Sequence, residues 1–78
     1  MKSIALIGAG NIGSRHLQGL SRVNFPVEID IIDPSEQSIA VALDRYKQCS
    51  KNKNVKRIST HSNLNGISKT IDLAIIAS

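Results

Sequence analysis

The chain of 78 residues has few of the side chains that most often stabilise a small protein by covalent bonds or aromatic packing. Its single cysteine, Cys49, excludes a disulfide within the chain. One Phe, one Tyr and no Trp leave no aromatic surface on which nucleic-acid bases could stack. No apolar run approaches the ~18 residues of a membrane-spanning helix. We therefore expect no nucleic-acid partner, no membrane partner and a cytoplasmic location.

Acidic residues are also scarce. Six Asp and Glu stand against ten Lys and Arg, which gives a formal net charge of +4. Four of the ten basic residues lie within residues 51–57. This cluster is a candidate nucleic-acid patch, but without aromatic neighbours we interpret it as a solvated loop. His16 and His61 share no ligand motif, so no metal site is predicted.

A glycine-rich motif follows the first apolar run of the chain. Gly8, Gly10 and Gly13 have the spacing Gly-x-Gly-x-x-Gly. The first glycine allows a tight turn, the second lets a pyrophosphate approach the backbone, and the third lets a helix pack close to the strand. The free N–H groups near Asn11 and Ile12 would then point at the phosphates. This pattern predicts a dinucleotide-binding turn.

A second apolar run, residues 27–33, ends in an acidic residue. Asp33 follows Gly13 at a distance of about 20 residues, the spacing at which a carboxylate meets the adenosine ribose. A carboxylate accepts hydrogen bonds from both ribose hydroxyls and repels a 2′-phosphate. Neither Pro34 nor Ser35 supplies a positive charge there. The pattern therefore favours NAD over NADP.

Asp33 has a second interpretation, as the cap of the following helix. In that arrangement Asp33 is the N-cap, Pro34 the first helical residue and Glu36 the third. A carboxylate has two oxygens, so one side chain could serve both purposes.

The hydrophobic pattern predicts an α/β fold. We expect strands at 2–7, 27–33, 55–59 and 71–77, helices at 12–23 and 35–48, and a helical turn around 64–67. Right-handed crossovers give the strand order 3-2-1-4, a partial Rossmann fold of about four parallel strands with two main helices. Ile39 and Leu43 are expected to be the most buried residues of the second helix.

Ligands of such a sheet bind beyond the carboxyl ends of the strands, next to the point where the strand order reverses. Several of the residues singled out above fall at these ends. The predicted cofactor-binding residues are Gly8, Gly10, Asn11, Ile12, Gly13, Asp33, Ala77 and Ser78. No catalytic residue is predicted in the chain.

Three segments together resemble the amino-terminal part of the Gfo/Idh/MocA oxidoreductase family. They are residues 8–16 (GAGNIGSRH), Asp33-Pro34 and residues 71–78 (IDLAIIAS). The resemblance implies a Rossmann domain followed by a second α/β domain, and hydride transfer between NAD(P) and a sugar or polyol. The catalytic lysine of that family lies in a Glu-Lys-Pro motif on a later strand, and this motif does not occur here.

The length bounds the domain organisation. A chain of 78 residues holds one domain at most and buries only about 60% of its unfolded surface. A complete doubly wound domain needs two βαβ halves, and this chain has room for one half and a fourth strand. We expect residues 1–78 to be the N-terminal part of a dinucleotide-binding domain, with the substrate domain absent.

Two hypotheses about function follow. The resemblance implies the NAD-binding fragment of an oxidoreductase acting on a sugar or polyol. The alternative is a stand-alone nucleotide-binding regulatory module without catalysis. In either case we expect a homo-oligomer formed through the edge of the fourth strand or the uncovered sheet face.

Arg15 and His16 follow shortly after the third glycine of the motif. Arg15 could reach a phosphate or extend into solvent. His16 could contact cofactor or substrate, or it could hold the helix to a loop by a hydrogen bond.

Overall fold

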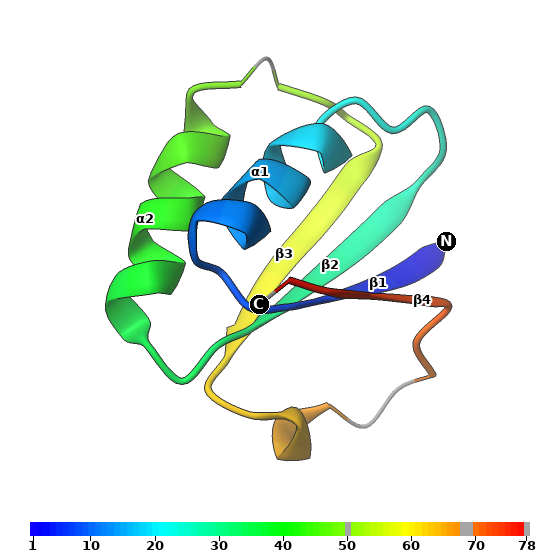
Figure 1. Cartoon of the computed structure of the whole chain (residues 1–78). Helices are drawn as coiled ribbons and strands as arrows, with labels where there is room; N and C mark the ends of the chain where they lie inside the picture. The colour runs from blue at the N-terminus through cyan, green and yellow to red at the C-terminus, as the bar shows by residue number, and fades with distance from the viewer. Residues whose placement is uncertain (50, 68–69, 78) are drawn as a thin grey trace.

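The computed structural model describes residues 1–49, 51–67 and 70–77. The elements are β1 (Lys2–Ile7), α1 (Asn11–Leu20), β2 (Val27–Ile32), α2 (Glu36–Lys47), β3 (Val55–His61), the 3₁₀ turn η1 (Leu64–Gly66) and β4 (Leu73–Ile76). The four strands form one parallel sheet in the order β3-β2-β1-β4. Figure 1 shows α1 and α2 together over one side of the sheet and η1 well away from both. The predicted α/β fold and strand order are confirmed.

The central strand β1 is buried on both faces. It pairs with β2 on one side and with β4 on the other. Ile4, Ala5 and Leu6 are all buried, although their side chains alternate between the two faces. This double burial explains why the strand is a continuous apolar run instead of an alternating one.

The hydrophobic core lies between the sheet and the two helices. Leu17 of α1 and Ala42 of α2 are fully buried, and they pack with the inward-facing side chains of β1 and β2. Ile39 and Leu43 are only partly buried, so the prediction that they are the most buried residues of α2 is wrong. A small side chain such as Ala42 lets the helix lie close to the sheet, and the larger ones then flank the contact. Burial, with a contribution from Cys49, raises the pKa of Tyr46 above its ordinary value.

Polar pairs between strands lie on the sheet face that points away from the helices. Ser3 Oγ donates to Glu28 Oε1 at 2.7 Å, and Arg57 Nη2 lies 2.9 Å from Glu28 Oε2. His61 Nε2 lies 2.8 Å from Oδ1 of the buried Asp30. The basic segment predicted to be a solvated loop therefore contributes Arg57 to a cross-strand ion pair.

The helices differ slightly from their predicted ranges. α1 begins one residue before the predicted 12–23 and ends three residues earlier, because the backbone tightens and the N–H of Val23 bonds to the carbonyl of Leu20. α2 agrees with the predicted 35–48 within one residue at each end. Within the described ranges, no helix is long and apolar enough to cross a bilayer.

The strand ends also differ from the predicted ranges, because the pairing of strands cannot be inferred from the hydrophobic pattern alone. β3 extends two residues beyond the predicted 55–59, to His61, because its polar end still pairs with β2. β4 is shorter than the predicted 71–77, yet the N–H of Ala77 donates to the carbonyl of Ile7 at 2.9 Å. The ladder therefore continues to the end of β1, where the candidate site lies.

Replacing Leu17 with alanine tests the core. Leu17 is 0% exposed, whereas Leu64 on η1 is 55% exposed and provides a matched control. We expect Leu17→Ala to lower the free energy of unfolding by about 2–5 kcal/mol, because it leaves a cavity between α1 and the sheet. Leu64→Ala should change it by no more than about 0.5 kcal/mol. Urea unfolding followed by circular dichroism measures both, and equal losses would contradict the packing described.

Candidate functional site: the glycine corner

The turn after β1 is held against the end of β4. Gly8 has a positive φ of 103°, a conformation that other residues rarely adopt. A Cβ at this position would overlap the carbonyl oxygen of Ala77, and the Gly8 N–H donates to the carbonyl of Ile32 at 2.8 Å. Gly8 is therefore required both by its backbone angle and by its neighbour.

The first turn of α1 lies equally close to this turn. A Cβ at Gly13 would overlap the carbonyl oxygen of Gly8, and it would lie 3.8 Å from the Cβ of Ala77. Because the clashing atom belongs to the backbone, no side-chain rotation could relieve the overlap. Gly13 is thus the residue that lets α1 begin directly against the end of β1.

Gly10 has a different environment. Its φ is −69°, which any residue can adopt, and a Cβ built on it would meet no atom within 4 Å. Neither the backbone nor a neighbour in the described part of the chain requires a glycine here. The space above Gly10 is open to a ligand that would have to approach the backbone closely.

The two helices begin differently. Gly10 is the N-cap of α1 and provides no side-chain hydrogen bond, and the first turn contains no acidic residue. In α2, by contrast, Ser35 Oγ accepts from the N–H of Ser38 at 3.2 Å, and Glu36 occupies the first turn. The N–H groups and the positive dipole end of α1 are therefore free to meet an anion at the open space above Gly10.

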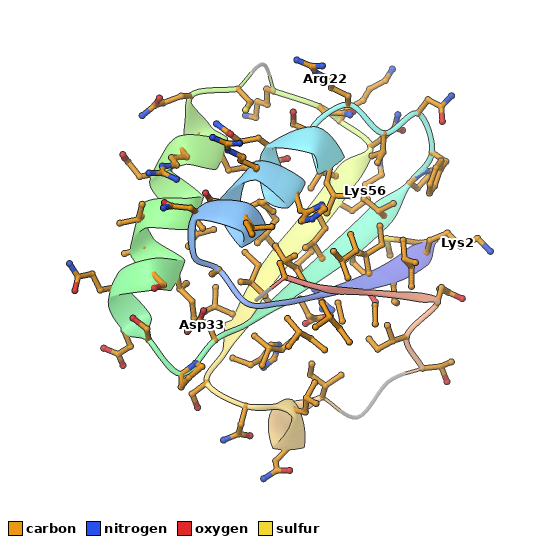
Figure 2. The ribbon with its side chains drawn as sticks, in the orientation of Figure 1. Lys2, Arg22, Asp33 and Lys56 are labelled. Atoms are coloured by element: carbon orange, nitrogen blue, oxygen red, sulfur yellow. The ribbon has the colours of Figure 1, made fainter. Side chains whose placement is uncertain are left out.

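Asp33 lies directly beside the glycine turn, as Figure 2 shows. Its Oδ2 accepts from the N–H of Ala9 at 2.8 Å, and its Oδ1 accepts from the N–H of Ser35 at 2.8 Å. The N-cap of α2 is Ser35, so the interpretation of Asp33 as the N-cap is wrong. A carboxylate has about four acceptor positions, which leaves capacity for two ribose hydroxyls.

Arg45, which no sequence pattern singles out, also reaches this site. Arg45 of α2 donates from Nη1 to Ser14 Oγ at 2.7 Å and lies 3.5 Å from Asn11 Oδ1. The hydroxyl of buried Ser14 in turn donates to the carbonyl of Asn11 at 3.0 Å. No motif or spacing marks Arg45, because only the packing of α2 against α1 brings it to the first turn of α1.

The structure gathers most of the predicted cofactor-binding residues at the carboxyl ends of the strands. These are Gly8, Gly10, Asn11, Ile12, Gly13, Asp33 and Ala77. Ile12 is 54% exposed beside the glycine turn. Ser78 lies outside the described residues.

Arg15 and His16 are both exposed on α1. Neither side chain forms a hydrogen bond within the described ranges, so the hydrogen bond expected to hold His16 to a loop is not present there. The described residues also contain no group of three or more His, Cys, Asp or Glu placed to hold a metal ion.

These groups fit the adenosine and pyrophosphate portion of a dinucleotide. The open space at Gly10 and the N-terminus of α1 match a pyrophosphate, and the carboxylate of Asp33 matches a ribose. Comparison with protein-family models, with curated proteins and with solved structures finds no match to this chain.

Alanine substitutions at three glycines separate these roles. We expect Gly13→Ala to lower the free energy of unfolding by more than about 2 kcal/mol, because its Cβ would overlap a backbone carbonyl. Gly10→Ala should lower it by no more than about 1 kcal/mol, because alanine is a poorer N-cap than glycine although its Cβ meets open space. Gly19→Ala, at an open helical position, should be stabilising by about 0.5–1 kcal/mol. Denaturant unfolding measures all three, and a large loss in Gly10→Ala would refute the open space.

Proposed function

We propose that this chain binds NAD at the glycine corner, as the cofactor-binding portion of an oxidoreductase similar to the Gfo/Idh/MocA family. The observation that carries the proposal is Gly10. It is a glycine that neither its φ angle nor any described neighbour requires, and it caps a helix whose first turn has no acid. Glycine is a common N-cap residue, and a pyrophosphate that contacts the backbone there adds a reason for the absence of a side chain.

The neighbouring groups support the same ligand. The backbone N–H groups near Asn11 and Ile12 offer donors to the phosphate oxygens. The Asp33 carboxylate offers acceptors to the two ribose hydroxyls, and its negative charge disfavours the 2′-phosphate of NADP. No basic side chain stands at Pro34 or Ser35 to reverse that preference.

The part of this chain in the reaction is to bind and orient the cofactor. Bound NAD supplies the hydride acceptor for oxidation of an alcohol carbon in a sugar or polyol. Gly8 and Gly13 set the position of the turn and the helix, and Asp33 sets the position of the ribose relative to them. The proposal assigns no residue of this chain to moving a proton to or from the substrate.

Calorimetric titration with NAD and NADP tests the proposal. We expect Gly10→Ala to weaken NAD binding by at least about tenfold, because the added methyl group would occupy the space of the pyrophosphate. Gly19→Ala, whose Cβ also meets open space but lies at the other end of α1, should leave the affinity unchanged. Equal affinities of the two variants, or the absence of NAD binding by the folded wild-type chain, would refute the proposal.

Asp33→Ala gives a sharper readout, because it separates ribose binding from support of the turn. If Asp33 binds the ribose, its removal weakens NAD by about tenfold or more and relieves the repulsion of NADP, so the ratio of the two affinities falls. If Asp33 only supports the turn through Ala9, both dinucleotides weaken by the same factor. An unchanged ratio would therefore contradict the ribose role.

We also propose that the chain forms a homo-oligomer through β4. On its far side from β1, β4 pairs with no other described strand. Leu73 and Ile76 of this strand are 53% and 74% exposed. An open edge with apolar side chains favours pairing with the same edge of a second copy.

Light scattering coupled to size exclusion measures the oligomeric state. We expect the wild-type chain to be a dimer or larger assembly. Ile76→Lys should shift it toward the monomer, because a lysine on an edge strand discourages pairing. Leu64→Lys, at a similarly exposed position on η1, should not. A wild-type monomer at high concentration would contradict the proposal.

A further inference from the structure

A groove runs along the seam between α1 and α2, on the outer side of the helix layer. It consists of two hollows of about 710 Å³ and 460 Å³ that share Arg15, Gln18 and Gln48 as lining residues. Arg22 lines the larger hollow and Arg45 the smaller one. We call this surface, defined by these five residues, the seam groove.

The seam groove is positively charged, and no acidic side chain in its lining neutralises that charge. Three guanidinium groups line it, and no acidic side chain lines either hollow. Within the described ranges no carboxylate forms an ion pair with Arg15, Arg22 or Arg45, and the hydrogen bonds of Arg45 go to neutral oxygens. Three like charges along one groove repel each other, and a bound anion would replace that repulsion with attraction.

The uncharged lining residues add hydrogen-bond donors. The amides of Gln18 and Gln48 and the hydroxyl of Ser21 lie along the same hollows. Guanidinium groups present parallel N–H pairs that match the oxygens of a phosphate. Together these groups suit an elongated ligand with many oxygen atoms and several negative charges.

The larger hollow of the seam groove is separate from the glycine corner, whereas the smaller hollow reaches the corner through Asn11 and Arg45. Figure 2 shows Arg22 extending beyond the C-terminal end of α1, at the opposite end of the helix layer from Asp33. The larger hollow is lined by residues 15–22 of α1 and the turn after it, and by Gln48 and Cys49 at the end of α2. None of these is a residue predicted to bind the dinucleotide.

The lining also indicates which part of a ligand is recognised. The larger hollow has the size of a small-molecule site, for which volumes of about 300–1,000 Å³ are usual. No aromatic side chain lines it, so it offers neither a stacking surface for a base nor an aromatic anchor for a protein partner. We propose that the seam groove binds a chain of linked phosphate groups and recognises the phosphates themselves.

Inorganic tripolyphosphate is the probe, titrated calorimetrically into the full chain at low ionic strength. We expect the double variant Arg15→Gln, Arg22→Gln to lose at least about tenfold in affinity, the loss of two charge-assisted contacts. The matched control, Lys2→Gln with Lys56→Gln, removes the same charge from two exposed lysines outside the groove and should change affinity by less than about twofold. Arg45 is left intact because it also contacts the glycine corner.

Further variants and ligands separate this site from the dinucleotide site and identify the class of ligand. The loss caused by Arg15→Gln with Arg22→Gln should persist in a Gly10→Ala background, because these arginines line the larger hollow and Gly10 does not, so failure of either proposal can be recognised independently. ATP should bind within about threefold of tripolyphosphate, because the groove has no surface for the base. Four results would overturn the proposal. They are no binding to the wild-type chain, equal loss in the two charge variants, no loss from the arginine substitutions in the Gly10→Ala background, or tighter binding of an oligoglutamate peptide than of tripolyphosphate.

Discussion

The close approach of three backbone segments at the glycine corner is the constraint on which the rest of this structure depends. The turn after β1, the first turn of α1 and the residue after β4 touch one another without space for a Cβ at Gly8 or Gly13. This contact sets where α1 leaves the sheet and how closely β4 lies beside β1. Because it joins residues nearly 70 positions apart, it ties the last strand to the first turn of the chain.

The glycine corner leaves space for a Cβ at Gly10, in contrast to Gly8 and Gly13. Two of the three glycines are required by the protein itself, and Gly10 is not. The carboxylate of Asp33 bonds to the N–H of Ala9 within this turn, so the end of β2 is fixed relative to the open space. The unfilled volume of the corner lies at the N-terminus of α1, where the helix dipole is positive.

Charge is distributed unevenly between the two sides of the sheet. On the face away from the helices, Glu28 forms an ion pair with Arg57, and Asp30 lies within hydrogen-bond distance of His61. Along the seam of α1 and α2, Arg15 and Arg22 meet no described carboxylate. The excess positive charge of the chain is thus concentrated in part on one groove, where an anionic ligand could balance it.

The element order and the strand order were predictable from the amino-acid sequence, because the apolar runs, the glycine spacing and the handedness of crossovers follow local or topological rules. The sequence placed Gly8, Gly13 and Asp33 at one site for the same reason. It did not reveal Arg45 beside Ser14, the choice of Ser35 as the cap of α2, or the burial of Ala42 in place of Ile39. The positions of Arg45 and Ala42 depend on how closely α2 packs against α1 and the sheet, a distance that no spacing within the chain encodes. The role of Asp33 depends on its bond to the N–H of Ala9 in the glycine turn, which leaves Ser35 to cap α2.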